Sequence, residues 1–237
     1  MLGCCASAAL WYCHRPMVHA TVGARASTAK AWSNPFRVSS PAYREAEEYH
    51  KWILNNKKMD SVVGSESDID RLRSAGQLMS KGMPRLPTAL LEQYLPLVGR
   101  ILASMNTENC GDFIHGKLTT SKLMDYAYPI IESFDNNDAK TWFAFNRSAI
   151  DAELDTYPII VLKNTDAMQG ILMIAKSLPD SQHKSFMSDL AALTKESNDK
   201  ACTTARILFY KGESLPEPYR GYIARLLLTG NEGHEPL

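Results

Sequence analysis

Two pairs of acidic and histidine residues have a spacing that could hold a metal ion. Glu47 and His50 are three residues apart, and Asp112 and His115 repeat the same step. Residues three apart share one face of an α-helix, and carboxylate-bridged di-iron bundles use this step. A mononuclear site built from these four side chains is therefore one hypothesis, with neutral imidazoles and ionised carboxylates as ligands. The competing interpretation is two solvated helix faces, because charged helix surfaces often show this spacing by chance.

Two cysteines in the body of the chain could form a disulfide. Cys4, Cys5 and Cys13 lie near the N-terminus, whereas Cys110 and Cys202 stand alone in the remainder, 92 positions apart. In an oxidising compartment, such a pair would form one bridge. Closing so long a loop would stabilise the fold by about 4 to 5 kcal/mol in the chain-entropy model. The alternative is two buried free thiols that pack as small apolar side chains.

Other catalytic patterns are incomplete or absent. The stretch from Gly111 to Lys117 has the spacing of a phosphate-binding loop, but Leu118 replaces the required hydroxyl and no apolar strand precedes it. Cys110 and His115 cannot act as a nucleophile pair on one helix, because five helical steps turn their side chains about 140° apart. The sequence contains no G-x-S-x-G, H-E-x-x-H or C-x-x-C motif. We therefore predict no catalytic residue and no cofactor.

The elements that would position these side chains are helices. The central stretch Leu86–Lys117 indicates a buried helix, a corner and a second helix. Its first half has apolar residues at intervals of three and four: Leu90, Leu91, Tyr94, Leu97, Val98, Ile101, Leu102 and Met105. Similar stripes recur along the chain between polar corners, without a fixed repeat period. The predicted fold class is all-α, a single globular multi-helix bundle of about nine or ten helices, with an irregular stack of helical pairs as the alternative.

Two apolar groups have a location that the sequence leaves open. Tyr157–Leu162 is short, apolar and rich in β-branched residues, which is typical of a strand. Because no other segment offers a partner strand, we interpret it as a buried connector or the start of the next helix. Trp142, Phe143 and Phe145 follow helical spacing and are predicted to be core residues. If Trp142 and Phe145 were exposed together, they would form a docking patch for a partner.

The N-terminal arm, residues 1–40, differs from the rest of the chain. It contains four basic residues and no acidic residue. The apolar run Leu2–Cys13 resembles the core of a signal peptide, although no basic residue precedes it. A mitochondrial transit peptide and a plain disordered tail are the alternatives. We assign residues 1–40 to a targeting or disordered arm and 41–237 to one all-helical domain. A secreted or periplasmic location is favoured over a cytoplasmic or mitochondrial one.

The composition excludes some classes of partner. The body carries mixed charges without a basic cluster, which argues against nucleic-acid binding. No apolar run reaches the roughly 18 residues that a membrane span requires. The leading hypothesis is an exported all-α domain that acts by binding another protein. The alternatives are a helical enzyme that uses the carboxylate and histidine site, and an intracellular adaptor or secreted effector with a disordered delivery arm. A large exposed apolar patch would support protein binding.

Overall fold

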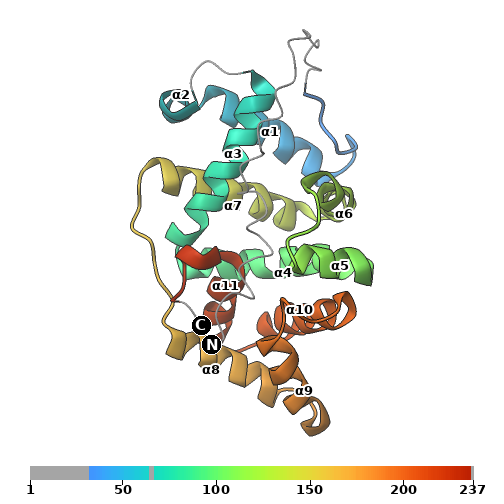
Figure 1. Cartoon of the computed structure of the whole chain (residues 1–237). Helices are drawn as coiled ribbons and strands as arrows, with labels where there is room; N and C mark the ends of the chain where they lie inside the picture. Colours follow the sequence, from blue (N-terminus) through green and yellow to red (C-terminus); the bar gives the residue numbers. More distant parts are fainter. Residues whose placement is uncertain (1–31, 64–66, 236–237) are drawn as a thin grey trace, which may run out of the picture.

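The described part of the chain is built from α-helices. The computed structural model describes residues 32–63 and 67–235, and in these residues it has eleven α-helices and no strand (Figure 1). The all-α prediction is confirmed, with eleven helices where about nine or ten were expected. The helices are α1 (Pro41–Asn55), α2 (Lys57–Val63), α3 (Asp68–Gly82), α4 (Thr88–Ser104), α5 (Thr107–Ile114), α6 (Thr120–Glu132), α7 (Asn136–Leu154), α8 (Asn164–Lys176), α9 (Asp180–Ala191), α10 (Asn198–Gly212) and α11 (Tyr219–Leu228).

Short polar side chains determine where many of these helices begin. The side-chain oxygens of Ser40, Ser67 and Asn106 each accept a hydrogen bond from a backbone N–H in the first turn of α1, α3 and α5. Such a cap satisfies an N–H that has no partner within the helix. The same arrangement occurs at Thr119, Asp135 and Ser197, before α6, α7 and α10. These starts are encoded locally, so the sequence pattern identifies several of them.

The helices are stacked in successive layers (Figure 1). From top to bottom of this view, α1 and α3 lie above α7, α4 and α5 follow, and α10, α11, α8 and α9 complete the stack. The most closely associated pairs are α3 with α7, α5 with α10 and α4 with α11. Since these partners are distant in sequence, non-local contacts hold the stack together. No helix among the residues that the structure describes is both long and apolar enough to cross a membrane.

The middle of the stack is apolar and contains the aromatic residues of α7. The ring of Tyr94 on α4 stacks against Phe145 and Trp142, with centroid separations of 3.8 and 4.7 Å. Phe143 and Phe145 are buried, and Trp142 is partly buried against the same core. These aromatic residues are therefore part of the core, as predicted, and they do not form a docking patch.

Part of the predicted N-terminal arm packs on the body. Phe36 is 7% exposed and belongs to the main apolar core. The hydroxyl of Ser40 donates to the backbone carbonyl of Glu132 at 2.7 Å, which joins the start of α1 to the end of α6. The apolar run Leu2–Cys13 and the rest of the arm up to residue 31 lie outside the described residues.

Candidate functional site

The first pair of residues predicted to bind a metal ion lies on α1. Glu47 accepts a hydrogen bond from Nδ2 of Asn34 at 3.1 Å. The ring of His50 stacks on Trp32, with centroids 3.9 Å apart. Helix α1 packs on α7, α3 and α6, whereas Asp112 lies on α5 and His115 caps its C-terminus, and α5 packs on α10. The two pairs therefore belong to different layers of the stack.

The second pair, Asp112 and His115, is occupied by a structural contact. The side-chain amide of Asn198 donates to Oδ1 of Asp112 at 3.1 Å, and its oxygen lies 3.0 Å from Nδ1 of His115. In the described residues, no group of three or more His, Cys, Asp or Glu side chains could hold a metal ion. The four-residue metal site formed by Glu47, His50, Asp112 and His115 is thus not assembled. The helical step places each pair on one face but does not bring the two helices together.

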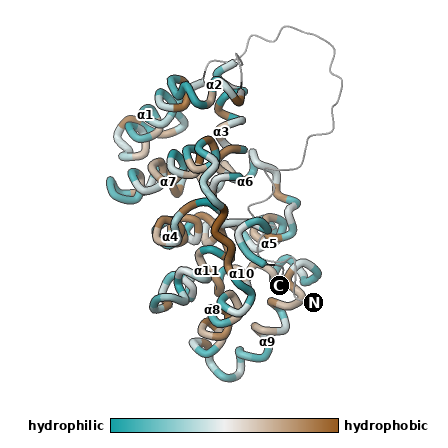
Figure 2. The backbone as a smooth tube through the Cα atoms, turned by 90° about the vertical axis from the view of Figure 1, so that its left-hand side faces the viewer, coloured by the Kyte–Doolittle hydropathy of each residue, from teal (hydrophilic) through white to brown (hydrophobic). Residues whose placement is uncertain are grey.

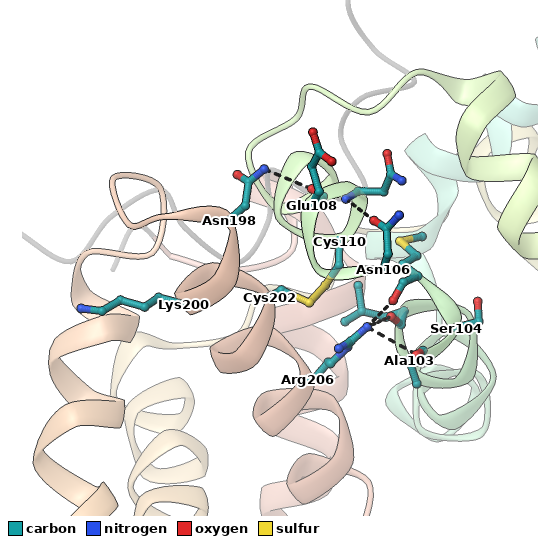
Figure 3. The surroundings of a disulfide bond; sticks show 12 residues. Ala103, Ser104, Asn106, Glu108, Cys110, Asn198, Lys200, Cys202 and Arg206 are labelled. Atoms are coloured by element: carbon teal, nitrogen blue, oxygen red, sulfur yellow. Dashed lines mark hydrogen bonds between the residues drawn. A yellow bond between two sulfur atoms is a disulfide. The ribbon is translucent and has the colours of Figure 1, made fainter.

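The predicted cysteine pair is present as a disulfide. Cys110 on α5 and Cys202 on α10 are both buried, and their Cα atoms are 5.3 Å apart (Figure 3). Beside the bridge, the amide of Asn198 donates to the backbone carbonyl of Glu108 at 3.1 Å. One turn beyond Cys202, Arg206 donates to backbone carbonyls at the end of α4, including that of Ala103. The disulfide therefore lies where α4, α5 and α10 are joined, and its role is structural: it links α5 covalently to α10.

The most exposed apolar stretch is the connection between α7 and α8. We call residues 157–161 the apolar segment. Tyr157, Ile159, Ile160 and Val161 are 49, 36, 42 and 52% exposed, and they make up four of the nine large apolar residues that are exposed in the described chain. Figure 2 shows the segment as a brown stretch of tube that crosses the front of the stack. The interpretation as a buried connector or helix start was wrong, because only Leu162 is buried and α8 begins at Asn164.

Alternate residues fix the apolar segment to the body. The N–H of Ile160 donates to the carbonyl of Pro84 at 3.0 Å. The N–H of Leu162 donates to Gly233, and its carbonyl accepts from the N–H of Glu235, both at 2.9 Å. Leu162 thereby forms an isolated parallel bridge with the C-terminal region. Residues 160 and 162 thus use their backbone groups on the side that faces the body, as alternate residues of an extended chain do.

Ile159 precedes the two anchored residues and Val161 lies between them, and both have free backbone groups. Neither Ile159 nor Val161 makes a backbone hydrogen bond to any residue that the structure describes. Because alternate residues of an extended chain direct their backbone groups to opposite sides, we expect the N–H and C=O groups of Ile159 and Val161 on the side away from the bonds of Ile160 and Leu162. The segment therefore offers two donors and two acceptors at a spacing of two residues, as the edge of a strand does, among exposed apolar side chains.

A strained turn directs the chain into this segment. Thr156 has a φ of 53°, in the left-handed region that glycine normally occupies after a helix. The N–H of Thr156 bonds to the carbonyl of Glu153, and that of Tyr157 to the carbonyl of Ala152, each at 3.0 Å. These two bonds form a Schellman motif at the end of α7. Since a β-branched residue adopts this conformation at a cost of about 1 to 2 kcal/mol, the surrounding contacts must impose it.

A buried arginine holds the segment from behind. Arg225 on α11 is 2% exposed, and its three guanidinium nitrogens bond to four oxygen atoms. These atoms are the backbone carbonyls of Pro84, Leu86 and Ile160 and the hydroxyl of Thr88. Burial lowers the pKa of Arg225 to about 10, so the side chain remains protonated at neutral pH. Its donors are therefore committed to fixing the apolar segment and the corner before α4.

A groove of about 400 Å³ lies beside the apolar segment. Ile160, Val161 and Leu162 contribute to its lining, together with residues of α4 and α11 and the start of α8. Three carboxyl groups also line the groove: Glu92, Asp166 and Glu217.

Two of these carboxyl groups interact directly. Burial raises the pKa of the Glu92 carboxyl, and the charge of Glu217 and a hydrogen bond with it raise this pKa further. Arg220 opposes the shift; its Nη2 lies 3.6 Å from Oε2 of Glu92 and also contacts Glu217. Glu92 therefore holds its proton to a higher pH than a free glutamate, because burial and a neighbouring carboxylate both disfavour its charged form.

A larger hollow of about 630 Å³ lies between α4 and α7 and has a polar lining. Its principal charged groups, Arg100 and Asp138, form an ion pair with an N–O distance of 2.6 Å, and Arg100 also lies over the ring of Phe134. Because these groups are already paired with each other, this hollow offers less to a ligand than the groove beside the apolar segment.

No protein-family model matches the sequence, and neither a curated protein nor a solved structure matches it. The apolar segment and its groove are therefore assigned from their geometry alone.

Proposed function

We propose that this chain is a protein-binding domain that takes up an extended segment of a partner protein along residues 157–161. The observation that carries the proposal is the free backbone edge at Ile159 and Val161 among exposed apolar side chains. Addition of a strand to such an edge is a general mode of peptide recognition, in which main-chain hydrogen bonds supply affinity and side-chain contacts supply specificity.

The shape of the site favours an extended partner over a helical one. A docked helix keeps its backbone groups for itself, so it would leave the N–H and C=O groups of Ile159 and Val161 unpaired. An added strand would pair them. The edge is short, because Pro158 has no N–H and the exposed Lys163 follows Leu162, and both features limit uncontrolled pairing between edges. A segment of about five or six residues would span it.

We also propose that the domain works in an oxidising compartment, secreted or periplasmic. The buried disulfide supports this location, since such bridges persist mainly outside reducing compartments. Intact-mass analysis of the protein from its host, with thiols alkylated before and after reduction, tests it. We expect Cys110 and Cys202 to be alkylated only after reduction. Direct alkylation of both in the native protein would overturn the proposed location.

Peptide binding to the full chain tests the proposed function. The probes are fluorescein-labelled hexapeptides with valine at every second position and varied polar residues between, and binding is followed by fluorescence polarisation. In ¹⁵N-labelled protein, we expect the bound peptides to shift the amide resonances of Ile159 and Val161. The absence of binding across the whole panel would overturn the proposal.

Substitution of Val161 separates backbone pairing from simple apolar contact. Val161→Pro removes the free N–H without breaking any intramolecular bond in the described chain, and an edge position tolerates proline. We expect it to weaken peptide binding by about tenfold or more. The matched control Val161→Thr keeps the N–H and the side-chain shape and should bind within about threefold of the native chain. Equal binding by both variants would exclude strand addition. Self-association abolished by Val161→Pro would identify a second copy as the occupant instead.

A further inference from the structure

We infer that the groove beside the apolar segment receives a lysine or arginine side chain of the bound partner segment. This inference rests on the proposed function and adds the chemistry of the partner. The edge and the groove share residues: Val161 offers free backbone groups and also lines the groove, together with Ile160 and Leu162. The groove therefore adjoins the segment along which a peptide would pair.

The groove has the dimensions and the walls for a long side chain. Its volume of about 400 Å³ is within the range of ligand sites in proteins and exceeds what one extended side chain fills. Ile160, Leu162 and Pro218 offer apolar contacts for a chain of methylene groups, and Tyr222 adds an aromatic ring. Lysine and arginine side chains combine such an apolar stem with a charged end.

The charges in the groove call for a cation. Glu92, Asp166 and Glu217 contribute three carboxyl groups to the lining. Two arginines lie nearby. The donors of Arg225 are committed to backbone carbonyls and to Thr88. Arg220 contacts Glu92 and Glu217 and leaves Asp166 without a contact to either arginine. A carboxylate at Glu92 also faces the negative charge of Glu217, which contributes to the raised pKa of Glu92. An ammonium or guanidinium group would compensate these negative charges and offer several N–H donors.

A metal ion fits this groove less well than an organic cation. The carboxyl groups that line it are not among any group of three or more potential ligands that could hold a metal within the described chain. A metal ion requires its ligand atoms within about 2.0 to 2.6 Å, whereas the head group of a long side chain can bridge carboxylates that lie farther apart. The three carboxyl groups therefore suit a lysine or arginine head group better than a metal ion.

Peptides that differ in one side chain test the inference. In the hexapeptide panel, lysine is moved through the positions between the valines and compared with norleucine, which has a similar stem without the charge. At one position, we expect lysine to improve binding by about tenfold. Glu92→Gln and Glu217→Gln should each reduce the lysine-to-norleucine ratio towards one. The control Glu232→Gln removes an exposed charge that does not line the groove and should keep the full ratio.

The outcomes distinguish this inference from the proposed function. If peptides bind and Val161→Pro weakens them, but lysine and norleucine bind equally at every position, the function stands and the basic side chain is excluded. If no peptide binds, both fall. A lysine preference that survives in both glutamine variants would place the cation elsewhere and overturn the assignment to this groove.

Discussion

Nη1 of Arg225 donates a hydrogen bond to the carbonyl oxygen of Ile160 at 2.9 Å, and this contact ties α11 to the middle of the apolar segment. The contact joins a fully buried cation to a residue whose own side chain is 42% exposed. The segment is therefore exposed on its outer side and anchored firmly on its inner side. Such an edge is preorganised, so a partner would lose little free energy in ordering it.

Loss of the arginine should therefore destabilise the whole stack. Arg225→Met keeps much of the volume but leaves the carbonyls of Leu86 and Ile160 unpaired, whereas the carbonyl of Pro84 keeps its bond from the N–H of Ile160. Because each unpaired buried polar group costs about 1 to 3 kcal/mol, we expect the free energy of unfolding to fall by about 3 kcal/mol or more. Urea unfolding followed by circular dichroism measures the change. The control Arg73→Met, which removes an exposed arginine paired only within α3, should unfold close to the native midpoint.

The disulfide should contribute strongly to stability. Cys110 and Cys202 are 92 positions apart, so their bridge closes a long loop in the unfolded chain. We expect the double variant Cys110→Ala, Cys202→Ala to lose about 4 to 5 kcal/mol in the chain-entropy model. Denaturant titrations with and without a reducing agent check this: reductant should lower the midpoint of the native protein and leave that of the double variant unchanged. Equal midpoints for native and double-variant protein under oxidising conditions would contradict the expectation.

Relief of strain at the end of α7 should stabilise the protein. At Thr156, with φ at 53°, glycine adopts the backbone conformation without steric cost. After the greater entropy of glycine in the unfolded chain is subtracted, we expect Thr156→Gly to raise the free energy of unfolding by about 0.5 to 1 kcal/mol. Thr156→Val retains the branched side chain and should give no gain. If Thr156→Gly is destabilising, the left-handed conformation at this residue is disproved.

The glutamate pair should make stability depend on pH. The folded pKa of Glu92 lies above its ordinary value of 4.5, mainly because the side chain is buried. Between these two pKa values, the native protein holds a proton that the unfolded chain has released, so the contribution of Glu92 to stability is lost as pH rises through the folded pKa. Glu92→Gln removes this dependence. We expect the stability of the variant relative to the native protein to increase as the pH rises above the ordinary carboxyl pKa of 4.5 in urea titrations. A constant difference would show that the carboxyl is not perturbed.

Much of the helical framework could be predicted because its signals are local. Apolar residues at intervals of three and four define α4, and polar side chains such as Ser67 and Asn106 begin helices by bonding to N–H groups of the first turn. The disulfide could be predicted because Cys110 and Cys202 are isolated from the three N-terminal cysteines. No local signal, however, specified that α1 and α5 occupy different layers, and so the metal site was placed across helices that do not pair.

The candidate binding site could be predicted only in part. The strand-like character of Tyr157–Leu162 was visible, but a short apolar run looks alike whether it is buried or exposed. Its anchors, Pro84, Arg225 and Gly233, are distant in sequence. The interaction of Glu92 with Glu217 likewise joins α4 to the turn before α11, and no local sequence pattern near either residue predicts it.

The position of the disulfide determines what happens when a protease cuts the apolar segment. The apolar segment lies between Cys110 and Cys202, within the loop that the bridge closes. A protease that cuts beside aliphatic residues at 159–161 would therefore produce two polypeptides that stay covalently joined. The nicked protein would migrate as one species until a reductant separates it. Cleavage in the apolar segment would thus open the covalent ring that the disulfide closes, without releasing a fragment.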